Sequence, residues 1–362
     1  MINRKLKVAI VSNSLAIGGA ERFASLLSKM LDGETIEVHN IIVNNVVNFE
    51  CKGEMYNLGK ASKSKFSLIR KIEKGFLLNQ YLNKNKIELI IDNRPRNHFL
   101  RELLAALIYG RRKQWFVIHS FNLKNYFPAP EFLSKKIYQK ADKLICVSKA
   151  IENLVTEKFG FSNTTTIYNS YEISKTESDE IKDSEKFVLF FGRFDDKVKN
   201  FSLLLEAFSQ SEIYHFGYSL YLLGDGPDLG LIKQEVKRLE LEKWVKMIPF
   251  VTNPYNYVSQ ARFTILTSHY EGFPMSVIES LAIGTPVVAV DCLSGPSEMI
   301  KSEFNGLLVE NHNAKVLAVA LKRMVEDDNL YQFCQHNAAR SVAHLTLESI
   351  AEQWKNLILS NQ

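Results

Sequence analysis

The sequence repeats one pattern twice: short apolar runs alternate with amphipathic stretches, and the alternation restarts after a polar segment. In the first half, KVAIVSN, IELIIDN and WFVIHS indicate strands, and RKIEKGFLLNQYLNKN and RNHFLRELLAALIYG indicate helices. In the second half, KFVLFFGRF, SLYLLGDG and TPVVAVD indicate strands, and FSLLLEAFSQ and LGLIKQEVKRLE indicate helices. This alternation predicts an α/β protein with two doubly wound domains, each a parallel sheet covered on both faces.

The domain boundaries follow from the places where this pattern breaks. We expect a first domain over residues 1–170, a linker over 171–186 and a second domain over 187–345. The linker contains EISKTESDEIKDSEK, which is charged and without periodicity. Residues 346–362 predict a last helix that packs back on the first domain. Open sheets of this kind bind ligands at the carboxyl ends of their strands, so we expect a cleft between two facing domains.

The bulk composition excludes several classes of protein. About 46% of the residues are hydrophobic and 23% are charged, as in a globular protein. We find no apolar run of about 18 residues, so we expect no transmembrane helix. The basic and then apolar start predicts a buried strand rather than a signal peptide. The four cysteines are scattered without a C-x-x-C pair, which argues against a metal site or a disulfide framework and favours a cytoplasmic location.

Charge is distributed unevenly along the chain. Residues 1–170 contain 27 Lys/Arg against 14 Asp/Glu, a balance of +13, whereas the remaining 192 residues contain 18 against 26, a balance of −8. One basic cluster has Glu73 as its single acid: Lys60, Lys63, Lys65, Arg70, Lys71 and Lys74. It is either a solvated helix face or a surface that attracts anionic lipid head groups or a diphosphate-bearing acceptor. No nucleic-acid-binding motif accompanies it, so we expect no nucleic-acid partner.

Two stretches of the second half concentrate residues that suit an anionic ligand. In HYEGFPMSVIESLAIGTPVVAVD, Glu271 lies in a Gly/Pro turn and Glu279 follows eight residues later on the helix that Pro274 can open. In FFGRFDDKVKN, Arg193 leaves the end of a strand and Lys199 begins a helix. Two such cations form either a clamp on a diphosphate or a surface ion pair. No D-x-D spacing is present, so we expect no metal ion.

The first half contributes two weaker candidates. Gly18 and Gly19 lie in a strand-to-helix turn, where backbone N–H groups favour an anion, although a plain tight turn explains them equally well. His119 ends a buried strand, at the edge of the sheet where ligands bind.

With these residues in view, EGFPMSVIESLAIGTPVV resembles the E-x7-E signature of the retaining nucleotide-sugar glycosyltransferases of family 4. Those enzymes have the GT-B fold, two Rossmann-like domains that face each other across a cleft. The segments GGAER, ICVSKAIENLV, IYNS, GRFDDKVKNFSLLLEAF and LLGDGPD fall in the expected order. The resemblance covers most of the chain and is densest from Phe187 to Val309. SGPSEMI is similar to bacterial members that extend lipid-linked or surface glycans, often with N-acetylhexosamine donors.

Two departures from the family pattern stand beside this likeness. Asn169 and Ser170 replace the common Asn–Gly, and the loops of the first half match poorly, which leaves the acceptor open.

The resemblance implies a role for each candidate residue. Glu279 would bind both ribose hydroxyls of a nucleoside diphosphate, and Glu271 would bind hydroxyls of the donor sugar. The turn between them would contact the diphosphate, with the base, uridine by resemblance, near Phe250; the turn consists of Gly272, Phe273, Pro274, Met275 and Ser276.

Catalysis, by the same resemblance, would use no metal and no other cofactor. Arg193 and Lys199 would stabilise the departing diphosphate, and His119 would contact the donor sugar. The anomeric configuration would be retained. The acceptor would be a glycan or a polyprenyl-diphosphate-linked sugar, with peripheral contact between the basic half and the inner membrane face.

Other functions remain open at this point. A sugar-nucleotide epimerase of related shape would act on the donor alone, and a catalytically decayed protein would only bind glycans. A NAD-dependent oxidoreductase is disfavoured because no G-x-G-x-x-G follows either first strand. A phosphorylase would need a cofactor-bound lysine, for which no separate motif is present.

Overall fold

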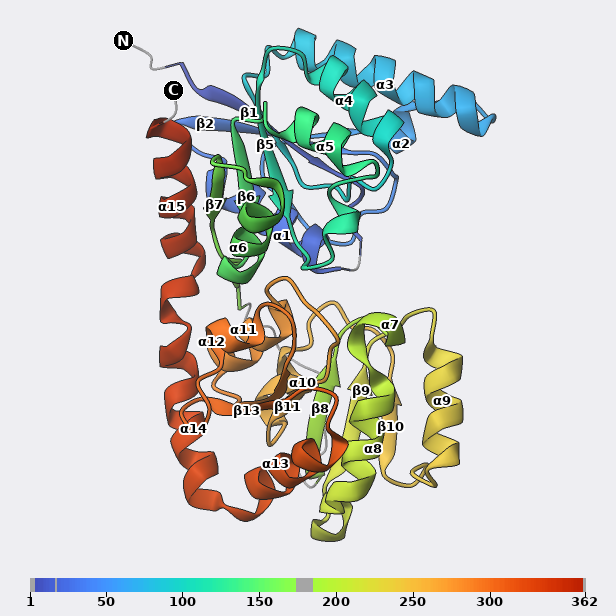
Figure 1. Cartoon of the computed structure of the whole chain (residues 1–362), viewed down its shortest axis with the longest axis vertical. Coiled ribbons are helices and arrows are strands. Elements are labelled where there is room, and N and C mark those ends of the chain that lie inside the picture. Colours follow the sequence, from blue (N-terminus) through green and yellow to red (C-terminus); the bar gives the residue numbers. More distant parts are fainter. Residues whose placement is uncertain (1–3, 17, 174–184, 361–362) are drawn as a thin grey trace. The chain divides into compact units, whose positions relative to one another are not determined.

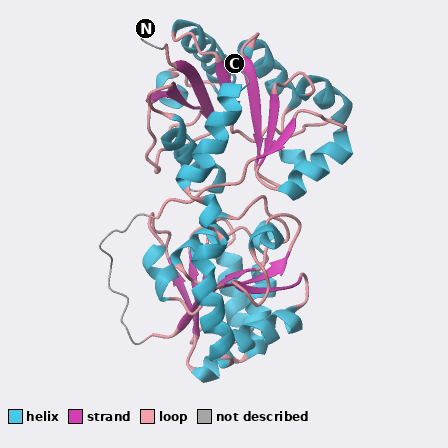
Figure 2. Ribbon diagram, turned by 90° about the vertical axis from the view of Figure 1, so that its left-hand side faces the viewer, coloured by secondary structure: helices cyan, strands magenta, loops and turns pink. Residues whose placement is uncertain are grey.

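The computed structural model describes residues 4–16, 18–173 and 185–360, which form two α/β units (Figure 1). One unit consists of Met1–Ser170 together with Leu347–Gln362, and the other consists of Tyr171–Thr346. Of the expected linker, residues 174–184 lie outside the described residues. Every strand pair of the two sheets is parallel, and helices cover both faces of each sheet (Figure 2), so the predicted fold class is confirmed.

The sheet of the first unit has seven strands in the order β3-β2-β1-β4-β5-β6-β7. The strands are β1 (Leu6–Ser12), β2 (Ile36–Ile42), β3 (Glu54–Asn57), β4 (Leu89–Asp92), β5 (Lys113–Ile118), β6 (Lys143–Cys146) and β7 (Thr164–Thr166). The central strands are buried apolar runs, which is the pattern of a parallel sheet covered on both faces. Strand β3 escaped sequence prediction because it is an edge strand whose first two residues are exposed.

The helices of this unit pack on the two faces of its sheet. They are α1 (Gly19–Leu31), α2 (Leu58–Ala61), α3 (Ser67–Lys84), α4 (Phe99–Tyr109), α5 (Glu131–Tyr138), α6 (Lys149–Phe159) and α15 (Leu347–Ser360), with a 3-10 turn η1 (Leu123–Asn125). Helix α15 packs on α1 because Trp354 is fully buried there, with its ring 6.1 Å from those of both Phe23 and Trp115. The last helix is therefore a structural part of the first unit.

The sheet of the second unit has six strands in the order β10-β9-β8-β11-β12-β13. The strands are β8 (Phe187–Phe191), β9 (Ser219–Leu223), β10 (Val245–Ile248), β11 (Thr264–Leu266), β12 (Val287–Asp291) and β13 (Gly306–Glu310). The helices are α7 (Asp196–Lys199), α8 (Phe201–Ser211), α9 (Leu229–Arg238), α10 (Tyr255–Gln260), α11 (Met275–Ile283), α12 (Pro296–Met299), α13 (Ala314–Glu326) and α14 (Asp328–Ser341), with 3-10 turns η2 (Ile213–Phe216) and η3 (Ala343–Leu345).

The break between α7 and α8 sets the position of one candidate residue. Asn200 has a φ of +55°, a left-handed conformation that asparagine tolerates better than most residues. Its side chain accepts a hydrogen bond from the N–H of Leu203 at 3.3 Å and so caps α8. The short α7 consequently ends at Lys199, and the chain turns into the buried helix α8 behind it.

Candidate functional site

The strand order of each sheet reverses beside its first strand. In the second unit, the chain proceeds from β8 outward through β9 and β10, and then returns to pair β11 with the other side of β8. The loops after β8 and β11 therefore diverge at the same sheet edge, which is where open α/β sheets bind ligands. Arg193 and Lys199 follow β8 and Glu271 follows β11, so the fold places all three at this point.

Lys199 and Glu271 form an ion pair, with 2.6 Å between Nζ and Oε1. The hydroxyl of Ser268 donates to the same Oε1, also at 2.6 Å. The side chains of Lys199 and Glu271 are only 18% and 12% exposed, so the pair is shielded from much of the solvent. The sequence grouped Lys199 with Arg193 as a phosphate clamp, whereas the structure joins it to the predicted sugar-binding glutamate.

The two loops that carry this pair are also joined through their backbones. The hydroxyl of Thr267 donates to the carbonyl of Lys199 at 2.8 Å, and the N–H of His269 donates to the carbonyl of Val198 at 2.8 Å. These bonds fix the end of α7 against the loop after β11. The ion pair is therefore held in place before any ligand arrives.

Arg193 is exposed in the loop after β8, whose backbone is tightly confined. Gly224, in the loop after β9, has a φ of +151°, and a Cβ there would lie 1.9 Å from the carbonyl oxygen of Gly192. A Cβ on Gly226 would lie 2.2 Å from the carbonyl oxygen of Phe194. The two glycines of the GDGPD turn thus allow the loop after β9 to pack against the loop that presents Arg193.

The segment between the two glutamates is a buried loop followed by a helix. Gly272, Phe273 and Pro274 are buried, and Pro274 is the N-cap of α11, which contains Met275, the half-buried Ser276 and Glu279. The hydroxyl of Ser294 donates to the carbonyl of Gly272 at 2.8 Å.

Behind this loop, Gly295 has a φ of +98°, and a Cβ there would lie 2.6 Å from Cδ of Pro274. The loop is therefore tightly confined, and it directs the N-terminus of α11 toward the edge of the sheet where ligands bind.

The two glutamates have different surroundings. Glu271 is half-buried at the sheet edge, whereas Glu279 lies on the second turn of α11 and is only 4% exposed. Because an ionised carboxylate is costly to bury, its presence in a helix that faces the core indicates a role beyond solubility.

Phe250 lies at the same edge of the sheet but farther from its centre. It follows β10, two strands away from β8, and is half-buried. The N–H of Gly224 donates to the carbonyl of Ile248 at 3.0 Å and so joins the loop after β9 to the end of β10.

In the first unit, Gly18 and Gly19 precede and begin α1. Gly18 has an extended backbone with a φ of 168°, and a Cβ there would meet only the carboxylate of Glu21, the end of a flexible side chain. Steric crowding and backbone strain therefore do not by themselves require glycine at position 18.

His119 follows β5, next to the end of β4, and has a specific partner that the sequence did not suggest. Its Nε2 is hydrogen-bonded to Oδ1 of Asn93, whose Nδ2 donates to the carbonyl of Ala20 at 2.8 Å. The amide nitrogen of Asn93 is the donor in that second bond, so the atom that faces His119 is the amide oxygen, which can only accept. The Nε2 of the imidazole is therefore the donor and carries the proton.

The ring of His119 also packs edge-on against Phe23, with the centroids 4.7 Å apart. Burial, with a smaller contribution from the charge of Arg96, lowers the pKa of His119 to about 3. The histidine is therefore neutral near pH 7.

A buried ionic cluster supports the strand end that carries Asn93. Arg94 donates to both carboxylate oxygens of Asp92, at 3.0 and 2.7 Å, and contacts Glu102 at 3.4 Å. Arg96 is fully buried and donates to the carbonyls of Asp92, Arg94 and Val117. The residues of this cluster are far more buried than charged residues normally are, so it fixes the loop after β4 rigidly.

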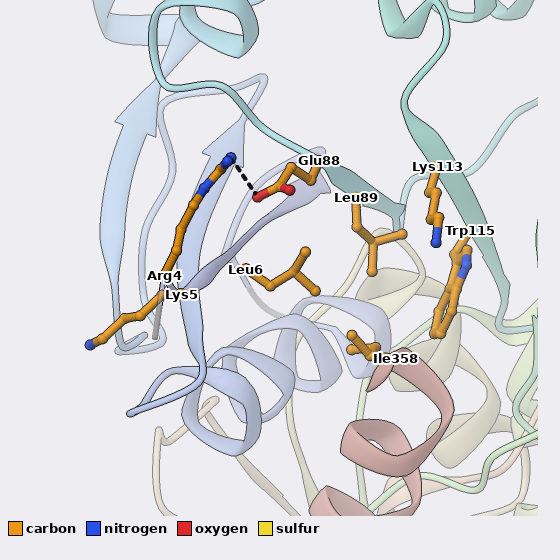
Figure 3. A pocket seen from close by; sticks show the side chains of 8 residues that line it. All are labelled: Arg4, Lys5, Leu6, Glu88, Leu89, Lys113, Trp115 and Ile358. Carbon is orange, nitrogen blue, oxygen red and sulfur yellow. Dashed lines mark ion pairs between the residues drawn. The ribbon is translucent and has the colours of Figure 1, made fainter. Parts of the chain in front are cut away.

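A cavity of about 320 Å³ lies at the opposite edge of the first sheet (Figure 3). Leu6, Leu89 and Lys113, the first residues of β1, β4 and β5, line it together with Ile358 of α15. It belongs to the amino-terminal ends of the strands, away from the candidate residues. Among the described residues, no group of three or more His, Cys, Asp or Glu is placed to hold a metal ion. In the same part of the chain, no helix is both long enough and apolar enough to cross a bilayer.

Comparison with known proteins gives consistent matches over the length of the chain. Residues 17–175 match the model described as Glycosyltransferase Family 4, and residues 173–341 match Glycosyl transferases group 1. A Campylobacter jejuni protein, N-acetylgalactosamine-N,N'-diacetylbacillosaminyl-diphospho-undecaprenol 4-alpha-N-acetylgalactosaminyltransferase, is 31% identical over 92% of this chain and 93% of its own length.

Two solved structures extend the comparison. Staphylococcus aureus TarM, as a mutant in complex with Fondaparinux, alpha-GlcNAc-glycerol and UDP, matches with a TM-score of 0.66 and 25% identity over 78% of this chain and 58% of its own. Anabaena HepE in complex with UDP and glucose matches with a TM-score of 0.80 and 18% identity over 98% of this chain and 100% of its own.

Proposed function

The chain belongs to the family 4 glycosyltransferases, enzymes of GT-B fold, and from this premise we propose that it transfers a hexose or N-acetylhexosamine from a UDP-sugar to a hydroxyl of a lipid-linked or surface glycan. The acceptor class is supported by the C. jejuni relative, whose name includes a diphospho-undecaprenol-linked sugar. The nucleotide is supported by the UDP in the titles of the TarM and HepE structures. We propose that the reaction takes place in the cytoplasm, at the inner face of the membrane.

The observation that carries this proposal is the Lys199–Glu271 pair at the reversal point of the second sheet. A partly shielded cation at the carboxyl edge of a parallel sheet is suited to an anionic leaving group. A carboxylate beside it is suited to the hydroxyls of a sugar. The pair thus sets the reacting sugar carbon next to the charge that develops when its bond to phosphate breaks.

In the proposed reaction, the bond between the anomeric carbon and the phosphate oxygen breaks, and the bond between that carbon and the acceptor oxygen forms. The electron pair of the broken bond leaves with UDP, and Arg193 and Lys199 stabilise its negative charge. The acceptor attacks from the face that the diphosphate leaves, and its proton passes to a phosphate oxygen. The configuration at the anomeric carbon is therefore retained.

The other candidate residues hold the donor. We propose that Glu279 accepts hydrogen bonds from the two ribose hydroxyls and that the N-terminus of α11 binds the diphosphate. The uracil lies near Phe250. His119 assists as a neutral imidazole, and Arg193 and Lys199 supply the charge for which other transferases use a metal ion.

Titration calorimetry with UDP and the Glu279→Gln variant tests the donor site. Loss of a charged acceptor for two hydroxyls should weaken UDP binding by roughly tenfold or more, because hydrogen bonds to a charged group contribute about 1.5–3 kcal/mol. Glu206→Gln, a change at an exposed position of α8, should leave the affinity unchanged. Equal affinities for wild type and Glu279→Gln would remove Glu279 from the ribose contact.

The identity of the product distinguishes the proposed transfer from the alternatives. An NMR spectrum of the product should show the sugar joined to the acceptor with the anomeric configuration of the donor. An isomerised sugar nucleotide in the absence of acceptor would instead indicate an epimerase, and glycan binding without turnover would indicate a decayed enzyme.

A further inference from the structure

Helices α3 and α4 of the first unit present large apolar side chains to solvent. On α4, Leu100, Leu104 and Leu107 are 73%, 59% and 71% exposed. On α3, Ile69, Ile72 and Phe76 are 54%, 67% and 67% exposed. We name these six residues the α3–α4 face.

Their spacing makes each set one stripe along its helix. Positions 69, 72 and 76 are three and four residues apart, and positions 100, 104 and 107 are four and three apart, the spacings of helical neighbours on one side. The sides of the helices that pack inward are different, since Leu78, Leu82 and Ala105 are buried. The chain therefore places a second apolar stripe on each helix, turned away from the core.

The two stripes lie on neighbouring helices (Figure 1). A Cβ on Gly75 of α3 would lie 3.4 Å from Cδ1 of Ile108, so the helices approach each other closely there. Farther along, Arg112 donates to the side-chain oxygen of Asn83 at 2.6 Å, which joins the end of α3 to the residues after α4. The helices thus run side by side, and both stripes belong to the same part of the first unit.

Cations border this surface where α3 begins. Lys63 and Lys65 are exposed just before the helix, and Lys71 is exposed on it. Glu73, the only acid of the basic cluster, accepts hydrogen bonds from the backbone N–H groups of Lys63 at 2.9 Å and Ser64 at 3.0 Å, which lower the pKa of its carboxyl. The acid thus holds the lysine-bearing loop against the helix.

One lysine of the basic cluster takes no part in this surface. The ammonium of Lys74 donates to the carbonyl of Val43 at 2.6 Å, and its side chain is half-buried. The bordering charge therefore comes from the residues that flank the apolar stripes, not from every residue of the cluster.

Exposed apolar side chains on neighbouring helices, beside a border with more lysines than acids, indicate an interaction site. We propose that the α3–α4 face docks on an anionic lipid bilayer, with its apolar side chains at the boundary of head groups and acyl chains and its lysines on anionic head groups. Amphipathic helices with basic borders bind membranes in this way. A second copy of the chain fits less well, because a symmetric contact would bring the lysines of both copies toward one another.

This inference rests on the proposed function in one respect, because a lipid-linked acceptor is reached at a membrane. The first unit holds the docking surface and the second unit holds the proposed UDP site, so separate measurements test them. Vesicle flotation without donor or acceptor reports the docking alone, and calorimetry with UDP reports the donor site alone.

The full chain would be floated with vesicles of phosphatidylcholine alone and of phosphatidylcholine with phosphatidylglycerol. We expect binding to the anionic vesicles at least tenfold tighter than to the neutral ones, because each lysine near such a surface contributes about 1 kcal/mol. The double variant Leu104→Ser/Leu107→Ser should lose most of this binding. The double variant Lys63→Gln/Lys65→Gln should weaken it roughly 30-fold.

Matched controls use exposed apolar residues elsewhere. Leu231 is 59% exposed on α9 and Val319 is 67% exposed on α13, both in the second unit, and changing either to serine should leave flotation unchanged. A wild-type circular dichroism spectrum and denaturant unfolding curve for the Leu104→Ser/Leu107→Ser variant would show that its first unit is folded. Equal binding to neutral and anionic vesicles, or no binding to either, would overturn the proposal. So would a dimer in sedimentation that the Leu104→Ser/Leu107→Ser variant dissociates without any change in flotation.

Discussion

Replacement of Lys199 by methionine tests the arrangement at the sheet edge most sharply. Methionine keeps much of the length and apolar character of the side chain but removes the charge. The change should lower kcat by roughly 10²-fold or more, a loss of about 2.7 kcal/mol of transition-state stabilisation, because a preorganised charge partner of the leaving group is lost.

The structure also predicts a smaller effect of this change on folding. Removing one partner of a fully buried ion pair costs about 3–5 kcal/mol. Here the two side chains are 18% and 12% exposed, and Ser268 continues to donate to Glu271. We therefore expect unfolding of the second unit to become easier by only about 1–3 kcal/mol, which leaves the protein folded at room temperature.

The assay should separate these two effects. Steady-state turnover of the donor gives kcat, denaturant unfolding gives stability, and calorimetry gives the affinity for UDP. A combined variant, Lys199→Met/Glu271→Gln, completes a double-mutant cycle, and the coupling of the two residues should exceed about 0.5 kcal/mol because they are in direct contact.

Lys197 provides the matched control, because it lies on the same short helix but is exposed. Lys197→Met should retain wild-type turnover and stability. A kcat for Lys199→Met within about twofold of wild type, in a protein that still binds UDP, would refute the assignment of Lys199 to the leaving group.

Four further predictions concern His119, Asn93 and the packing behind Arg193. Because burial lowers the pKa of His119 to about 3, protonation of its imidazole should change neither kcat nor kcat/KM between pH 5 and 8. An inflection of either profile near pH 6.5 that disappears in the His119→Asn variant would contradict this. The same shift means that the folded first unit binds fewer protons than the unfolded chain between about pH 3 and 6.5, so its free energy of unfolding should fall as the pH drops through this range, with a slope of at most about 1.4 kcal/mol per pH unit from this group. Asn93→Asp should raise the pKa of His119 by placing a carboxylate on Nε2 and so create an acidic limb in the pH–rate profile; an unchanged profile in this variant would argue against the Asn93–His119 contact. Gly224→Ala should destabilise the second unit by about 3 kcal/mol or more, measured by denaturant unfolding, because its Cβ would lie 1.9 Å from a backbone oxygen, whereas Gly230→Ala, in an open position on α9, should stabilise it by about 0.5–1 kcal/mol; similar values for the two would refute the packing argument.

The fold was predictable because buried parallel strands have a simple sequence pattern. Runs such as FVLFF of β8 and VVAVD of β12 stand out as continuous apolar segments between amphipathic ones. Strand β3 was missed because half of it is exposed at a sheet edge, where no apolar pattern is required.

The location of the candidate site was also predictable, but its pairing was not. Strand ends in a parallel sheet share one edge, which is enough to bring Arg193, Lys199 and Glu271 together. Lys199 and Glu271 are 72 residues apart in the sequence, and their contact depends on the geometry of two loops that have no periodic pattern. The partnership of Asn93 and His119 escaped prediction for the same reason, since it arises from the adjacency of β4 and β5.

The exposure of the apolar stripes of α3 and α4 could not be predicted from the sequence for a different reason. An amphipathic pattern shows which residues are apolar but not whether the core or the surface receives them. Leu100 and Leu107 lie in a stretch that the sequence predicts to be a helix, and only the folded unit shows that they are exposed. For the basic cluster, the sequence allows either a solvated face or an anionic partner, and the stripes beside it favour the second.

The measurement that tests the central claim most directly uses a panel of UDP-, GDP- and ADP-sugars with EDTA present. Saturation-transfer NMR detects which donor binds, and a hydrolysis assay detects which donor is slowly cleaved. The proposed function predicts that UDP-sugars bind and that one of them is slowly hydrolysed without metal, with both signals reduced in Glu279→Gln. Silence from every UDP-sugar, or turnover that EDTA abolishes and added metal restores, would contradict the proposed metal-independent transfer.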